Sequence, residues 1–166
     1  MATKNLFNKE AQNKIKELAE SIDFTMLATD LFSLPIHAIP MSTKRVDDLG
    51  QIWFLSNKNS EHNANIQKSN DVHLFYSKAM SMEFMNLYGK AEIVIDKGII
   101  EDLYQKSDDN WFKGKDDPNI TAIKVTPKDA HYWDTKNNIL VSMLKMGIGA
   151  ITGKKADLGE QGELSV

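Results

Sequence analysis

The chain of 166 residues contains no cysteine and has only four prolines and nine glycines. Without cysteine it can form no disulfide, use no thiolate nucleophile and bind no metal through sulfur. No run of apolar residues is long enough to span a bilayer, and the first residues lack the apolar core of a signal peptide. We therefore expect a cytoplasmic protein with no membrane partner.

An excess of basic residues is also missing. Asp and Glu number 23 against 20 Lys and Arg, so the formal net charge is −3. Nucleic-acid binding usually selects a basic surface, so we expect no nucleic-acid partner. The hydrophobic fraction of 42% and the charged fraction of 26% are typical of a folded globular chain. The length is ordinary for one domain, and we expect a single domain over residues 1–166.

Several signatures of catalytic chemistry are absent as well. The chain has neither a nucleophile elbow nor a glycine-rich phosphate loop, which argues against a serine hydrolase, a Rossmann enzyme or an NTPase. His37 and His73 fall inside predicted strands and lack the paired spacing of metal ligands. We expect no metal site.

What the chain does contain is apolar periodicity. Residues 8–22 place apolar side chains on one face at helical spacing, and Asn8 is in position to cap that helix. Gly89 lies inside a long predicted strand and indicates a bulge or a barrel corner. Antiparallel strands with peripheral helices favour a barrel, although these residues alone do not separate it from other small β folds. Strands are predicted at 24–29, 36–43, 51–56, 71–77, 82–95, 122–126 and 130–133, further helices at 98–106 and 138–151, and a polar, extended tail from about 153.

The most informative stretch runs from residue 36 to residue 66. It reads as a strand, a polar turn ending in Gly50, a second strand and the start of a helix. A glycine there supplies the positive φ of a hairpin turn, so we expect 36–43 to pair with 51–56. The second strand leads to a helix N-terminus, where free N–H groups and the helix dipole favour an anion. The pattern predicts a nucleotide-type ligand lying along a β surface.

An ordered set of short segments resembles the flavin-binding split barrels related to pyridoxamine 5′-phosphate oxidase, and among them the general stress protein 26 branch. The segments cover most of the chain in family order: 38–43, 48–56, 60–62, 111–118, 123–127 and 132–134. The resemblance implies a six-stranded antiparallel split β-barrel that forms a homodimer. It also implies FMN, with FAD as an alternative, bound at the subunit interface. The implied function is a flavin-dependent oxidoreductase with a small-molecule substrate and a stress-related role.

The resemblance assigns the flavin phosphate to the start of the helix after the second strand. Ser60 is placed there as the N-cap, with Lys58 and His62 on either side. The family commonly has lysine at the position of His62, and an imidazole is fully cationic only at lower pH. The alternative is that Ser60 merely caps a surface helix and that His62 is solvated.

The flavin ring is expected to meet backbone donors and acceptors and a flat apolar wall. The alternative to a flavin-binding role for the first strand is an ordinary edge strand containing a proline. The family often has arginine where this chain has Ile39. Trp111 is expected to shape the pocket or else to pack its own loop, and Trp133 to lie near the flavin or else inside the barrel. The remaining predicted binding residues are Pro40, Met41, Ser42 and Thr43 on the first strand, and Leu55 and Ser56 on the second.

Other functions remain open from the sequence. One is a flavin carrier or sensor without turnover, and another is a haem-handling split barrel, which would need His37, His73 or His131 as an iron ligand. No residue is assigned as a catalytic base. True pyridoxamine 5′-phosphate oxidase activity is not expected, because the chain has no arginine after Arg45 and lacks the C-terminal Arg-Leu-x-Pro segment of those enzymes.

Overall fold

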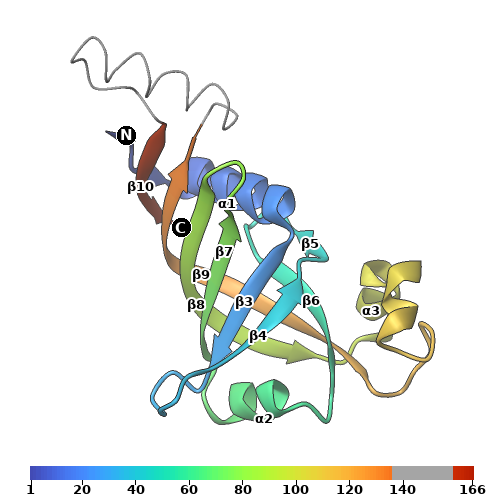
Figure 1. The fold of residues 1–166 in the computed structure, drawn as a ribbon. Coiled ribbons are helices and arrows are strands. Elements are labelled where there is room, and N and C mark those ends of the chain that lie inside the picture. The colour runs from blue at the N-terminus through green and yellow to red at the C-terminus, as the bar shows by residue number, and fades with distance from the viewer. Residues whose placement is uncertain (136–158) are drawn as a thin grey trace.

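Ten strands form one sheet in the described residues, 1–135 and 159–166 of this computed structural model (Figure 1). The order along the sheet is β5-β6-β9-β8-β7-β3-β4, while β10 pairs with the C-terminal part of β9, and β1 and β2 pair with β10. The strands are β1 (Ala2–Thr3), β2 (Leu6–Phe7), β3 (Phe24–Thr29), β4 (His37–Ser42), β5 (Arg45–Val46), β6 (Ile52–Asn57), β7 (Asp71–Lys78), β8 (Glu83–Val94), β9 (Ile120–Asp134) and β10 (Glu160–Ser165).

The predicted fold class, mainly antiparallel β with peripheral helices, is confirmed. Among the described strands, only β1 and β2 run parallel to their partner, β10. The described strands number ten rather than six, because β10 and three two-residue strands accompany the six longer ones between Phe24 and Asp134. Part of the tail predicted from about 153 is therefore a sheet strand. The helix predicted at 138–151 lies outside the described residues.

Helix α1 (Asn8–Ile22) lies across one end of the sheet (Figure 1). The predicted apolar face is confirmed, because Ala11, Ile15, Leu18, Ala19 and Ile22 are all buried. The predicted cap is wrong: Phe7 holds the N-cap position, and Asn8 is the first helical residue, with a φ of 50°. The other helices are α2 (Glu61–Lys68), α3 (Lys97–Leu103) and the short 3-10 helix η1 (Lys106–Asn110).

The two longest strands, β8 and β9, pair along nearly their whole length. Their register shifts between Tyr88 and Gly89, which confirms the predicted bulge. A Cβ at Gly89 would lie 2.6 Å from the carbonyl oxygen of Thr126, so the backbones can approach this closely only at glycine. Pro127 lies opposite Gly89 inside β9. The segments predicted as two strands, 122–126 and 130–133, are therefore one strand.

The predicted partner of β4 is wrong. β4 pairs with β3, in a register that runs from Phe24 opposite Ser42 to Thr29 opposite His37. The turn ending in Gly50, whose φ is 77° as predicted, instead joins the short strand β5 to β6. The chain changes partner directly after β4. As a result β4 and β6 diverge, and no strand pairing joins them in the described residues.

Two groups of buried apolar side chains hold these elements together. The larger group fills the inside of the sheet beneath α1, with Phe54, Leu74 and Tyr132 among its largest members. The smaller group lies between α3 and the neighbouring strands, and it joins Leu55 of β6 to Leu103 of α3. This second group holds α3 and the loop that follows it beside β6.

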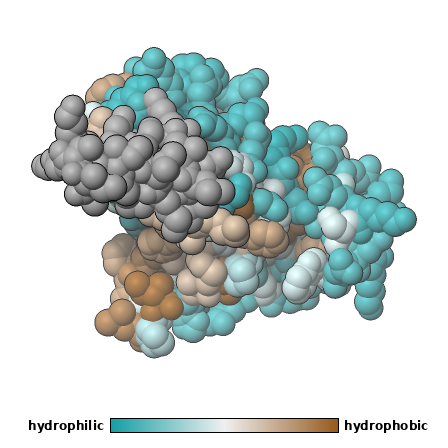
Figure 2. Space-filling view, turned by 45° about the horizontal axis from the view of Figure 1, so that its top comes forward, coloured by the Kyte–Doolittle hydropathy of each residue, from teal (hydrophilic) through white to brown (hydrophobic). Residues whose placement is uncertain are grey.

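Apolar side chains are also exposed in places. Figure 2 shows hydrophobic surface gathered toward the side where the loop between β3 and β4 projects in Figure 1, whereas much of the remaining visible surface is hydrophilic. The exposed side chains include Phe32, Leu34 and Ile36 of that loop. Among the described residues, no helix combines the length and the apolar character needed to cross a membrane.

Candidate functional site

The divergence of β4 from β6 opens a cleft of about 300 Å³. The N-terminal end of α2 borders it at one end and the loop after η1 at the other. Seven of the eleven predicted binding residues line it: Pro40, Met41, Ser42, Leu55, Ser56, His62 and Trp111. The structure adds five that the predicted set did not include: Phe24, Lys44, Asn57, Asp108 and Phe112.

The β4 border of the cleft presents backbone groups. Thr43 N donates to Asp23 O over 2.9 Å, which continues the β3–β4 ladder through the odd-numbered residues of β4. Backbone groups alternate in direction along a strand, so those of Pro40 and Ser42 point away from β3. Pro40 fits this pattern because it has no N–H to donate. β4 is thus an edge strand, and its free edge faces the cleft.

The β6 border presents backbone groups in the same way. Lys44 N donates to Trp53 O over 2.8 Å, so Trp53 turns its carbonyl away from β9. The same alternation turns the backbone N–H and C=O of Leu55 toward the cleft. No strand pairing in the described residues satisfies the groups on these two edges. They are available to a ligand that carries both hydrogen-bond donors and acceptors.

A hydrogen-bonded network closes the α2 end of the cleft. Ser60 is the N-cap of α2, as predicted, and accepts a bond from Asn63 N. The His62 Nε2 atom lies 2.6 Å from Ser56 Oγ and 3.0 Å from Ser60 Oγ. Ser56, Asn63 and Thr121 are at most 3% exposed. His62 is therefore held in a buried polar network rather than solvated.

The network fixes where its protons lie. The Thr121 hydroxyl donates to the Ser56 carbonyl oxygen, so it accepts from Asn63 Nδ2, 2.9 Å away. This turns Asn63 Oδ1 toward Ser56, whose hydroxyl donates to it over 2.7 Å. That bond uses the only proton of the hydroxyl, so the contact with His62 requires Nε2 to donate. Burial lowers the pKa of His62, which is therefore neutral at neutral pH, with its proton on Nε2.

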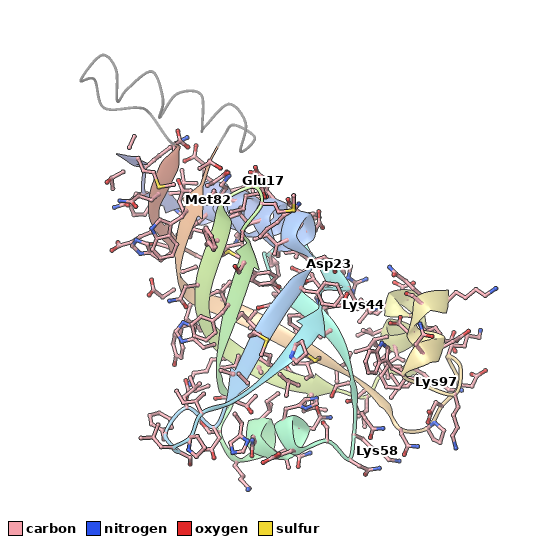
Figure 3. All side chains as sticks on the ribbon, viewed as in Figure 1. Glu17, Asp23, Lys44, Lys58, Met82 and Lys97 are labelled. Carbon is pink, nitrogen blue, oxygen red and sulfur yellow. The ribbon has the colours of Figure 1, made fainter. Side chains whose placement is uncertain are left out.

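The opposite end of the cleft is built around an ion pair. Lys44 Nζ lies 2.5 Å from Asp108 Oδ1, and both side chains are 8% exposed. Asp108 also accepts a bond from Gln105 N, which fixes η1. Beyond this pair, Phe112 packs toward Tyr104. Figure 3 shows Lys44 on the side of the sheet that faces α3 and η1.

Four predicted residues do not line the cleft. Thr43 Oγ1 lies 2.8 Å from the Tyr76 hydroxyl, and Ser60 takes part only through the network. Lys58 lies on the connection into α2 (Figure 3), and its Nζ donates to Pro118 O. Trp133 lies on the face of β9 opposite buried Tyr132, with its ring 5.1 Å from that of His131. Trp133 is therefore neither inside the barrel nor in the cleft of its own chain.

A second groove is a weaker candidate for a functional site. A larger open groove of about 760 Å³ lies beside α1. Its lining includes five acidic side chains and the Lys14–Asp134 ion pair, and it reaches Thr135, the last residue of the described range 1–135. Within residues 1–135 and 159–166, no three histidine, aspartate or glutamate side chains gather as metal ligands would. His37, His73 and His131 do not line the cleft.

Residues 10–157 match the family described as pyridoxamine 5′-phosphate oxidase like. The chain belongs to this family. Protein bli-3 of Neurospora crassa is 24% identical over 123 residues, and the match covers 69% of this chain and about 59% of the length of bli-3. General stress protein 26 of Bacillus subtilis is 22% identical over 95 residues, which cover 55% of this chain and 68% of that protein.

Solved structures show the same fold. A general stress protein 26 from Jannaschia sp. CCS1 superposes with a TM-score of 0.77 at 21% identity, over 94% of this chain and 98% of that one. The general stress FMN/FAD binding protein of Xanthomonas citri has a TM-score of 0.66 at 25% identity, over 79% and 93% of the two chains. These comparisons confirm the family resemblance and the split-barrel fold.

Proposed function

We propose that the cleft between β4 and β6 binds a flavin, with FMN preferred and FAD as the alternative. The observation that carries the proposal is the form of the cleft. The free backbone edges of β4 and β6 border an apolar wall, and this wall ends at the N-terminus of α2. A flavin ring needs backbone donors and acceptors beside a flat apolar surface, and both edges offer them. Family membership and the FMN/FAD-binding protein of Xanthomonas citri support the assignment.

The phosphate of FMN fits the α2 end of the cleft. The first turn of α2 has free backbone N–H groups, and the helix dipole places partial positive charge there. Ser60 Oγ already accepts from Asn63 N, so its hydroxyl proton is available to an anion. His62 is neutral at neutral pH, because burial lowers its pKa, and its one N–H already donates to Ser56 Oγ. The phosphate is therefore held by hydroxyl and backbone donors more than by a full positive charge.

The proposed activity is that of a flavin-dependent oxidoreductase acting on a small-molecule substrate in a stress-related role. A bound flavin would supply the hydride chemistry. The residues of this chain orient the ring between the two strand edges, hold the phosphate and keep water from the apolar wall. The alternative, a flavin carrier or sensor, has the same cleft and differs only in turnover. Haem is less well supported, because the cleft lining contains none of His37, His73 and His131.

We also propose that the chain forms a homodimer through the outer face of the sheet. Phe24 and Met26 of β3 are 61% and 40% exposed. Phe75 of β7, which pairs with Met26, is 45% exposed. Adjacent exposed apolar side chains of this size favour contact with another protein surface. Phe24 also lines the cleft, so a subunit covering this face would help to enclose the ligand.

Visible absorption tests the flavin site. After incubation with FMN and gel filtration, the protein should keep flavin bands in the blue and near ultraviolet. Trp111→Ala should weaken FMN binding by roughly 0.5–1.5 kcal/mol through loss of aromatic contact. Phe32→Ala is the matched control, because Phe32 is 83% exposed and Trp111 82%, and only Trp111 lines the cleft. A protein that retains no flavin would contradict the proposal.

Sedimentation equilibrium tests the dimer. The wild-type protein should show twice the 18.7 kDa mass of the chain at low micromolar concentration. Phe75→Glu should produce monomers, because it places a charge inside the proposed interface. Ile95→Glu, at an 80% exposed position outside that face, should leave the mass unchanged. A wild-type monomer that still binds FMN tightly would remove the dimer from the proposal.

Turnover separates an oxidoreductase from a carrier or sensor. The FMN-loaded protein is mixed anaerobically with NADH or NADPH, and bleaching of the blue flavin band is followed. Fast bleaching followed by reoxidation with a small-molecule acceptor indicates an oxidoreductase. Flavin that stays bound and is never reduced by either donor indicates the carrier or sensor.

A further inference from the structure

The described lining of the cleft carries no net charge. Only three side chains of this lining are of ionisable types: Lys44, His62 and Asp108. Lys44 and Asp108 cancel each other as an ion pair between two side chains that are each 8% exposed. His62 is held in the network at the other end and is neutral at neutral pH, because burial lowers its pKa.

The ion pair engages both charges, and a further hydrogen bond orients the carboxylate. Asp108 accepts from Gln105 N over 2.8 Å through its second carboxylate oxygen. The backbone of Lys44 is bonded to Trp53 O. A ligand anion that recruited Lys44 would leave Asp108 as a buried, unpaired carboxylate, which is strongly unfavourable.

Two aromatic side chains border the same cleft and remain largely exposed. Trp111, after η1, is 82% exposed, and Phe24, on β3, is 61% exposed in the single chain, where the proposed partner subunit would cover it. Exposed aromatic faces gain most from contact with another flat, apolar surface. The border of the cleft therefore offers planar apolar contact, and its interior offers no uncompensated charge.

We propose that the flavin-loaded cleft selects an uncharged, planar aromatic substrate and rejects anionic substrates, including phosphorylated ones. This inference rests on the proposed flavin site. The Lys44–Asp108 pair sets the selectivity, because Asp108 neutralises the only lysine in the described lining of the cleft. The substrate class thus differs from the phosphorylated compound for which the family is named.

The test uses a redox-inert pair of probes that differ in charge: naphthalene-2-sulfonamide, which is neutral, and naphthalene-2-sulfonate, an anion. Both are titrated calorimetrically into the FMN-loaded protein at neutral pH. We expect the neutral probe to bind at least tenfold more tightly. Equal binding of the two probes, or tighter binding of the sulfonate, would overturn the proposal.

Two variants test whether the ion pair causes this preference. Asp108→Asn keeps an oxygen for the Gln105 N–H but leaves Lys44 uncompensated, so the sulfonate should bind about tenfold more tightly than to wild type. The double variant Lys44→Met with Asp108→Asn is neutral again and should restore the preference for the sulfonamide. If Asp108→Asn keeps the wild-type preference, the ion pair does not set it and the proposal fails.

Flavin loading and folding are measured before each titration, by visible absorption and circular dichroism. A wild-type protein that takes up no FMN contradicts the proposed function and not the selectivity. A loaded protein that binds both probes equally contradicts the selectivity alone. If Asp108→Asn does not fold, equal or tighter binding of the sulfonate to the wild-type protein still overturns the proposal.

Discussion

The two ends of the cleft are built in different ways. At the α2 end, Ser56, Ser60, His62 and Asn63 lie within eight positions of one another, and only Thr121 comes from elsewhere. At the η1 end, Lys44 and Asp108 meet across 64 positions of sequence. The residues of the α2 end come mainly from one continuous strand, cap and helix. The residues of the η1 end are far apart in the sequence and meet only when the chain folds.

The difference has a consequence for stability. The α2 end is a satisfied network in which each hydroxyl and amide has a partner. A single substitution there removes only some of several neutral hydrogen bonds. The η1 end depends on one buried ion pair, and removal of either member leaves the other charge buried and unpaired. We therefore expect single substitutions to cost most at the η1 end.

The largest effect should follow Lys44→Met. Asp108 would remain buried without its partner, and the free energy of unfolding should fall by about 3–5 kcal/mol. Urea denaturation measures the change. Lys58→Met is the matched control, because the Lys58 side chain is exposed and its Nζ donates to Pro118 O, and it should change stability by less than about 0.5 kcal/mol. Equal losses in the two variants would show that the ion pair does not anchor η1.

A smaller loss is expected at the α2 end from Asn63→Leu. Leucine is similar in size but leaves the Ser56 and Thr121 hydroxyls each without one partner, which should reduce stability by about 2–3 kcal/mol. Hydrogen exchange should show faster opening of α2. Asn59→Leu, at an exposed position, provides the comparison. If the two asparagine variants are equally stable, the network contributes nothing.

Ser60→Ala sharpens the comparison further, because it removes one cap and one ligand donor. Loss of an N-cap hydroxyl should lower stability by about 0.5–2 kcal/mol. FMN affinity should fall by about tenfold through loss of one charge-assisted hydrogen bond, while riboflavin affinity stays the same. Calorimetry with both ligands separates the two roles. A variant that loses affinity for riboflavin equally would place Ser60 at the ring rather than at the phosphate.

The smallest effect should come from pH. Burial lowers the pKa of both His62 and His73, so between the folded pKa and the ordinary value of about 6.5 the unfolded chain binds more protons. Stability should therefore be constant above about pH 6.5 and fall as the pH drops below it. His62→Gln and His73→Gln should each remove part of this fall in thermal melts. A profile that both variants leave unchanged would assign the acid sensitivity to other groups.

The same direction of the pKa shift bears on FMN binding. If imidazolium binds phosphate better than neutral imidazole does, FMN affinity should fall with rising pH only below about 6.5 and stay level between pH 7 and 8. The second ionisation of the phosphate, near pH 6, opposes the fall, so His62→Lys serves as the control. The variant should bind FMN at least as tightly as wild type. A fall in affinity above pH 7 would mean that His62 titrates higher in the folded protein.

The sequence predicted the locally coded parts well. The buried face of α1, the Ser60 cap, the bulge at Gly89 and the left-handed Gly50 all follow from short-range patterns. The partner of β4 was predicted wrongly, because strand pairing is a long-range choice that a nearby turn does not decide. In the same way Asp108 gave no sign in the sequence that it would meet Lys44. Phe112 and Asn57 could have been included as neighbours of Trp111 and Ser56.

The central claim is that the cleft binds FMN with its phosphate at the α2 end. Parallel calorimetric titrations of the wild-type protein with FMN and riboflavin test it most directly. We expect FMN to bind with micromolar or better affinity and riboflavin to bind at least tenfold more weakly, because it lacks the group that the first turn of α2 and Ser60 would hold. Equal affinity for the two ligands, or no binding of either, would contradict the claim.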